Sequence, residues 1–313
     1  MKTIPTVPGA TPPGHRHARN ALAAALLGVA AALAFAFALP ARAQDADALR
    51  ARHESLREQL ASNQFKRPLH LESTQTSNDL KGDVYAVVDQ PYAVVGPALQ
   101  GTGNWCELLI LHLNVKHCAA SGAPPKEVLS LSVGRKFDQP LEDTHRVDFV
   151  YAQPTAGPDY LRVQMAAETG PLSTRNYRLT LEAVPLDAKR TFVHMSYAYA
   201  YGVAARMAMQ GYLATAGRDK VGFSITGKGD DGKPIYIDGV RGVVERNTMR
   251  YYLAIESYLG AVGAPAAEQQ EKRLRDWFGA VERYPLQLHE LERDEYLTMK
   301  RKEVARQKAA KPR

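Results

Sequence analysis

Alternating apolar and polar residues in the middle of the chain predict a series of β-strands. Within 145–152, Val147, Phe149 and Tyr151 alternate with polar neighbours, so that one face of the strand is apolar. A period of two residues is typical of strands with one buried and one solvated face. Together with the turn residues between the runs, the pattern predicts antiparallel strands over 113–119, 129–136, 145–152, 159–168, 176–184 and 190–201.

The last of these strands, 190–201, differs from the others in its aromatic side chains. Its odd positions include Tyr197, Tyr199 and Tyr201, whereas its even positions are mostly small. Tyrosine combines a large apolar surface with a hydroxyl group. The pattern therefore fits two interpretations: a core in which the hydroxyls are hydrogen-bonded, or the wall of an amphipathic cavity.

Spacings of three and four residues predict helices before and after this series of strands. The longest is expected over about 240–262, where Tyr251 and Ile255 belong to one stripe of the helix. An N-terminal amphipathic helix is expected over 45–62, and one or two strands follow it, the second being Asp83–Val88. Further helices are predicted over 91–99, 105–111 and 203–214, after Pro265, and towards the C-terminus.

The order of these elements, and two short segments within it, carry a resemblance to a known superfamily. A strand, two short helices, six antiparallel strands and a long helix follow one another over residues 82–262. The segment GDVYAVVDQPYAVV, followed by NWCELLILHLNVK, looks like the first strand and helix pair of bacterial START-like proteins. The resemblance implies an α+β helix-grip fold, in which a curved antiparallel β-sheet wraps around a long C-terminal helix, with extra N- and C-terminal helices.

This interpretation divides the chain into segments of different expected roles. They are a signal peptide (1–43), an N-terminal helix with a lead-in strand (44–81), the START-like domain (82–262) with an insertion (203–239), C-terminal helices (263–299) and a basic tail (300–313).

START-like proteins hold an elongated apolar molecule between sheet and helix, so the resemblance implies a lipid, isoprenoid or polyketide-like ligand here, with no cofactor. Ligand sites are mostly apolar with a few placed polar groups. The alternative is that the inner side chains fill the space completely. The expected lining consists of Phe149, Tyr151, Met165, Tyr177, Met195, Tyr197, Tyr199, Tyr251, Ile255 and Tyr258.

Two other functions stay open beside a ligand-binding role. A cyclase or dehydratase-type enzyme on the same fold would use tyrosine hydroxyls as acids and would need a polar cluster at the cavity floor. An envelope scaffold would instead present an apolar patch formed by Leu274, Trp277, Phe278 and Val281.

The first 43 residues predict export to the periplasm. They carry four bases and no acid, an apolar stretch over 21–39, and a small-x-small site that predicts cleavage after Ala43. Without them the net charge falls from +7 to +3, and the tail after Met299 alone contributes +6. Such a distribution is not that of a nucleic-acid-binding face. We expect the tail to be a solvated extension, with weak contact to an anionic membrane as the alternative.

The two cysteines, Cys106 and Cys118, are expected to form a disulfide in an oxidising compartment, the alternative being two buried thiols. Their neighbours His112 and His117 match no zinc spacing, so no metal site is predicted.

The sequence shows no catalytic constellation that names a reaction. Gly227 to Gly232 match G-x-G-x-x-G, but residues 233–236 continue as extended chain where a dinucleotide site needs a helix. Ser224 lacks the second glycine of a nucleophile elbow. His145, Asp148 and Glu168 are possible acid–base groups, yet strand parity directs Asp148 and Glu168 to solvent.

Overall fold

The computed structural model describes residues 41–215 and 217–310, in which Ala46 and all later residues belong to one compact unit. The predicted signal peptide lies outside the described residues except for its last three. Within the described part of the chain, no helix is long and apolar enough to cross a bilayer.

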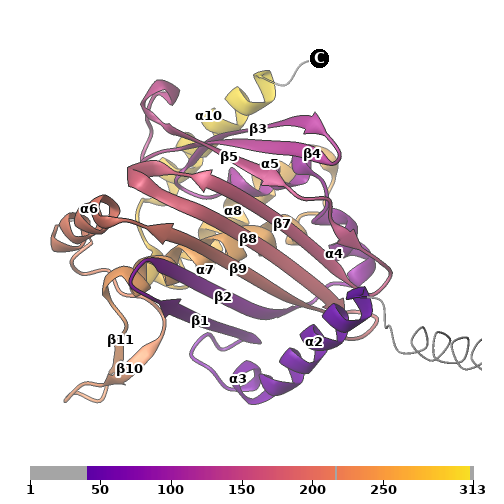
Figure 1. Ribbon diagram of the computed structural model, residues 1–313, viewed down its shortest axis with the longest axis horizontal. Helices are drawn as coiled ribbons and strands as arrows, with labels where there is room; N and C mark the ends of the chain where they lie inside the picture. Colours follow the sequence, from indigo (N-terminus) through magenta and orange to yellow (C-terminus); the bar gives the residue numbers. More distant parts are fainter. Residues whose placement is uncertain (1–40, 216, 311–313) are drawn as a thin grey trace, which may run out of the picture. The chain divides into compact units, whose positions relative to one another are not determined.

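A nine-stranded antiparallel sheet forms the centre of this unit (Figure 1). Eight strands follow the order β1-β2-β9-β8-β7-β5-β4-β3, and the short β6 pairs with β7. The α+β class and the large antiparallel sheet are thus confirmed. The strands are β1 (Leu69–Gln75), β2 (Asp79–Val88), β3 (Val115–Ala123), β4 (Lys126–Val133), β5 (His145–Tyr151), β6 (Thr155–Ala156), β7 (Leu161–Thr169), β8 (Thr174–Pro185) and β9 (Thr191–Tyr201).

All six strands predicted for the meander are present, with shifted ends. The end of β3 shifts by four residues, from 119 to Ala123, and β4 is displaced as a whole by three, from 129–136 to Lys126–Val133. The chain turns at Pro124-Pro125, and proline cannot donate to a strand ladder, so β3 continues to that point and β4 starts directly after it. The boundary predicted at residue 82 lies inside β2. In addition, β1, which was assigned to the preceding segment, pairs with β2 along its whole length.

Helices cover both faces of the sheet. They are α2 (Ala41–Ser55), α3 (Arg57–Ala61), α4 (Tyr92–Ala98), α5 (Thr102–Leu109), α6 (Val203–Ala214), α7 (Gly239–Gly260), α8 (Ala266–Val281), α9 (Pro285–Leu288) and α10 (Arg293–Ala309). In Figure 1, α5, α7 and α8 lie behind the strands. The longest, α7, contacts β1, β2 and β9, and α5 contacts β3 and β4.

A glycine allows the long helix to approach the sheet closely. A Cβ atom on Gly82 of β2 would collide with the side chain of Thr248 on α7. Three further helices follow it, where the extra C-terminal helices were predicted. Two helices, α7 and α5, thus share the inner face of the sheet.

The N-terminal segment packs on the opposite, outer face. It was expected as one helix over 45–62, but it is broken at Leu56 into α2 and α3. Leu49 and Leu56 lie in a second apolar cluster with Tyr85 of β2 and Phe192 of β9. Both faces of β2 and β9 are therefore covered, which explains why these strands read as nearly continuous apolar runs.

A half-buried histidine joins three strands on this outer face. His194 lies between two carboxylates: its Nε2 atom is 2.9 Å from Asp83 Oδ1, and its Nδ1 atom is 2.9 Å from Glu182 Oε2. The Tyr160 hydroxyl donates to Glu182, and the ring of Tyr85 stacks on His194 at 4.3 Å. Burial lowers the pKa of His194, but the hydrogen bonds to the two carboxylates outweigh it and raise that pKa.

The replacement His194→Gln is expected to lower the free energy of unfolding by about 1–3 kcal/mol, because it removes the positive charge and one of the donors between the buried Asp83 and the half-buried Glu182. The imidazolium contributes fully below its unfolded pKa of about 6.5, and this stability is lost as the pH rises through the raised folded pKa. Burial raises the pKa values of Asp83 and Glu182, but hydrogen bonds from His194 outweigh it and lower them. Their contribution is complete above about pH 4.5 and lost as the pH falls.

The effect of His194→Gln should therefore be largest between about pH 5 and pH 6.5. Urea unfolding of wild type and variant across this range measures the difference, with the exposed His145→Gln as the matched control. A difference that is independent of pH would contradict the assigned network.

The prediction that the basic tail is a solvated extension is wrong as far as Ala309, because α10 extends to that residue. Lys300 and Glu303 are fully buried, and Gln307 accepts a hydrogen bond from the backbone of Cys118 on β3. Arg301 pairs with Glu271 at 2.6 Å. The prediction placed these basic side chains in solvent because of their charge alone. Acidic and polar partners elsewhere in the chain allow them to be buried or paired.

Candidate functional site

Five of the ten predicted lining residues form a continuous series of ring contacts between the sheet and α7. Phe149 of β5 lies 6.1 Å from Tyr177 of β8, measured between ring centroids, and Tyr177 stacks on Tyr199 of β9 at 5.3 Å. Tyr199 lies 5.6 Å from Tyr197, which lies 5.2 Å from Tyr251 on α7. We call these five residues the aromatic series.

The hydroxyl groups of the aromatic series lie in a poorly solvated environment. Burial raises the pKa values of Tyr197, Tyr199 and Tyr251 above the ordinary range, so all three stay protonated at neutral pH. Among the described residues, none of these three hydroxyls has a hydrogen-bonding partner. Tyr177, nearer the surface, donates to Thr174 at 2.7 Å. The sequence left open whether the hydroxyls of Tyr197, Tyr199 and Tyr201 are bonded within a core. The Tyr201 hydroxyl donates to the backbone carbonyl of Thr76 at 3.2 Å, whereas those of Tyr197 and Tyr199 have no such bond within the described residues.

The other five predicted lining residues surround the aromatic series or lie apart from it. Met165, Met195 and Ile255 are buried in the same apolar core. The Tyr151 hydroxyl accepts a hydrogen bond from the backbone of Gly101. Tyr258 lies 4.2 Å beneath the guanidinium of Arg273 on α8, measured to the ring centroid.

A bulge in β8 sets the position of Tyr177. The register between β8 and β9 shifts between Arg175 and Arg178, so that Asn176 and Tyr177 together oppose one residue of β9. Asn176 has a positive φ of 53°. Bulges re-aim side chains and are frequent beside functional sites. A Cβ atom on Gly170 would collide with the Tyr177 ring, so the glycine leaves room for that ring.

The sheet is split beside Tyr177. In the described structure, β5 and β7 pair only at Val150–Ala166 and Tyr151–Met165, although β5 pairs with β4 along its full length. The split holds a cavity of about 590 Å³, which we call the slot. Pockets for small molecules have volumes of about 300–1,000 Å³. The slot is lined by Arg146, Asp148, Val150, Ala166, Ala167, Glu168, Thr169, Asn176, Tyr177 and Arg178.

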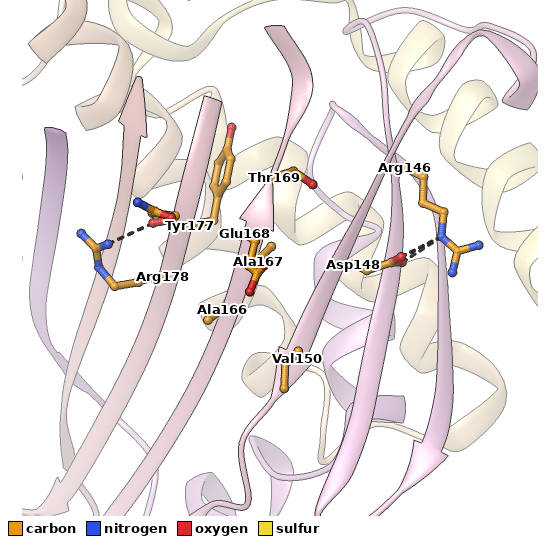
Figure 2. A pocket seen from close by; sticks show the side chains of 10 residues that line it. Arg146, Asp148, Val150, Ala166, Ala167, Glu168, Thr169, Tyr177 and Arg178 are labelled. Carbon is orange, nitrogen blue, oxygen red and sulfur yellow. Dashed lines mark hydrogen bonds and ion pairs between the residues drawn. The ribbon is translucent and has the colours of Figure 1, made fainter. Parts of the chain in front are cut away.

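Figure 2 shows the two sides of the slot: Arg146 and Asp148 on β5, and Ala167 and Glu168 on β7. Arg146 pairs with Asp148 at 2.8 Å, and this contact holds the pKa of the carboxyl below its usual range. The prediction that Asp148 and Glu168 face solvent is confirmed, since both are exposed. Tyr177 belongs both to the lining of the slot and to the aromatic series, so the two meet at this residue.

Part of this arrangement had no signal in the sequence. Strand parity identified the tyrosines that point inward. The split between β5 and β7 depends on how far the two strands pair, and the sequence of each strand does not show this. His112, which was considered only as a metal ligand, stacks on Tyr251 with ring centroids 4.5 Å apart. It extends the aromatic series away from the slot.

Cys118 forms the predicted disulfide with Cys106. The G-x-G-x-x-G match covers the end of β10 (Ile225–Lys228) and the turn that leads to β11 (Pro234–Tyr236), so extended chain follows it, as expected.

The apolar surface that a scaffold would present is not exposed. Leu274, Trp277 and Val281 are buried, and Trp277 stacks on Tyr296 of α10 at 5.0 Å. Phe278 also packs against the core. Docking of α10 therefore covers the face of α8 on which the scaffold hypothesis depended.

No protein-family model matches the sequence, and no curated protein matches it. Among solved structures, a norcoclaurine synthase from Thalictrum flavum is 14% identical, covering 46% of this chain and 90% of that one, with a TM-score of 0.32. The Zhui aromatase/cyclase from Streptomyces sp. R1128 is 12% identical, covering 69% and 96%, with a TM-score of 0.31. A conserved protein of unknown function from Enterococcus faecalis is 5% identical, covering 76% and 91%, with a TM-score of 0.30. At these identities and TM-scores, the likeness carries no argument about function.

Proposed function

We propose that the protein is an exported, START-like binder of a hydrophobic small molecule, which enters through the slot and lies along the aromatic series. The observation that carries this proposal is the run of ring contacts from the slot to α7, with Tyr177 common to both. The strand order supports membership of the superfamily, and residues 1–43 support export to the periplasm.

The chemistry of the aromatic series favours binding over catalysis. Tyr197, Tyr199 and Tyr251 offer apolar faces and hydroxyls without protein partners, which suits a molecule with a few polar atoms. A general acid works best when its pKa lies near the operating pH. Burial raises the pKa values of these hydroxyls away from neutrality, which argues against the cyclase or dehydratase alternative.

A bulky label at the slot is expected to slow ligand entry. Within the described residues neither native cysteine is free, so Glu168→Cys introduces a single reactive thiol at an exposed position of the slot. After modification with a bulky maleimide, we expect phenylnaphthylamine, a neutral fluorescent probe, to associate at least about tenfold more slowly in stopped-flow measurements. The unmodified variant should behave like wild type.

The matched control is Ser121→Cys on β3, which is exposed and does not line the slot. Its modification should leave the association rate unchanged. Equal rates for both labelled variants would contradict entry through the slot, and the lack of saturable probe binding by wild type would contradict the function itself.

A further inference from the structure

The inner end of the aromatic series carries a buried hydrogen-bond donor without a partner. His112 lies between α5 and β3, is 2% exposed, and stacks on Tyr251. Its Nδ1 atom accepts a hydrogen bond of 3.1 Å from the backbone N–H of Asn114. A neutral imidazole that accepts at one nitrogen carries its proton on the other, so Nε2 is the donor. In the described structure, His112 Nε2 is buried and has no hydrogen-bonding partner.

An orphaned donor of this kind is unusual in a folded protein. Buried polar atoms nearly always have a partner, and leaving one without a partner destabilises the folded state. Water or a ligand atom commonly satisfies such a group. The three unpartnered tyrosine hydroxyls of the aromatic series lie on the same side of the sheet, so the inner end of the site is rich in donors.

The charges around His112 favour a hydrogen-bond acceptor that is negatively charged. Burial lowers the pKa of His112 well below its ordinary value, and the positive charges of Arg250, Lys300, Lys136 and Lys116 lower it further. The imidazole is therefore neutral. Two carboxylates oppose these four cations: Glu290 pairs with Arg250 and Lys136, and Glu303 pairs with Lys116 and Lys300.

We propose that His112 Nε2–H anchors the polar end of the ligand, and that this end is an acidic or strongly accepting oxygen on an aromatic molecule. The inference rests on the proposed function and adds a ligand class to it: an aromatic acid, with rings along the aromatic series and its carboxylate, sulfonate or phenolate oxygen at His112. A hydrogen bond from a neutral donor to a charged acceptor is stronger than one between neutral groups.

Two probes with the same ring system separate the anchor from the apolar site. Anilinonaphthalene sulfonate carries the acidic group and phenylnaphthylamine lacks it. Wild type is expected to bind the sulfonate more tightly, and each probe should displace the other. The variant His112→Phe keeps an aromatic ring beside Tyr251 and removes the donor. We expect it to weaken sulfonate binding about tenfold or more, while the affinity for phenylnaphthylamine changes less than about threefold.

Two further variants make the test specific. His112→Gln keeps an N–H donor at a similar distance from the backbone and should retain most of the sulfonate affinity. His117→Phe is the matched control, since His117 is half-buried on β3 and takes no part in the ring contacts. Near-ultraviolet circular dichroism establishes that each variant is folded.

The outcomes distinguish the inference from the function on which it rests. If wild type binds both probes equally, or if His112→Phe weakens both to the same extent, the anchor is wrong while the binding site stands. If wild type binds neither probe in a saturable manner, the proposed function fails as well. Selective loss of the sulfonate in His112→Phe, with recovery in His112→Gln, supports the anchor.

Discussion

Replacing Glu303 by alanine is expected to lower the free energy of unfolding by about 3–5 kcal/mol. The carboxylate lies 3.2 Å from Lys116 Nζ and 2.8 Å from Lys300 Nζ, and all three side chains are fully buried. Lys300 also donates to the backbone carbonyls of His112 and Val115. Replacing the one acid of this three-residue group leaves two buried ammonium groups without it as a counter-charge. Removing one partner of a buried ion pair destabilises a protein more than replacing both partners by apolar residues.

The pH dependence of this loss is a second readout. Burial lowers the pKa of Lys300 to about 8. Without Glu303 the amine gives up its proton more readily, so the loss should shrink as the pH is raised towards about 8, where the wild-type amine also loses its proton. The control is Glu271→Gln, whose partners Arg275 and Arg301 are largely exposed and whose loss should cost about 1 kcal/mol or less. Equal effects of the two variants in urea unfolding would contradict the docking of α10 through this cluster.

Removal of the disulfide is the second change with a large expected effect. Cys106 of α5 and Cys118 of β3 are separated by 12 residues in the sequence, and both are buried. In the chain-entropy model such a crosslink contributes roughly 3 kcal/mol by restricting the unfolded chain. We expect the double variant Cys106→Ala, Cys118→Ala to lose about 2–4 kcal/mol of unfolding free energy.

Reduction provides the control for this experiment. A reductant should destabilise wild type by a similar amount and leave the double variant unaffected, because the variant has no bond to break. If wild type unfolds at the same urea concentration with and without reductant, then the pair is not bonded in solution.

The sequence could predict the sheet because its signal is local. Alternation identifies Val147, Phe149 and Tyr151 as the inward face of β5, and proline and glycine positions mark most turns. The break at Leu56 and the burial of Lys300 could not be predicted in the same way. Both depend on contacts with residues distant in the sequence, and tertiary partners override local charge and propensity.

The site was only half predictable for the same reason. Parity placed the tyrosines of β9 on one face, and helical spacing placed Tyr251 opposite them. The slot requires β5 and β7 to separate after two paired positions, and the role of His112 requires knowledge of which buried nitrogen lacks a partner. Neither feature produces a periodic pattern of residues from which it could be predicted.

Native mass spectrometry of the mature protein, purified from its own cell envelope and followed by solvent extraction, tests the central claim most directly. We expect one small molecule bound per chain, released on denaturation, with aromatic rings and an acidic or accepting oxygen. A protein of unliganded mass that also fails to bind phenylnaphthylamine would contradict the ligand-binding role, and the aromatic series would then be ordinary core.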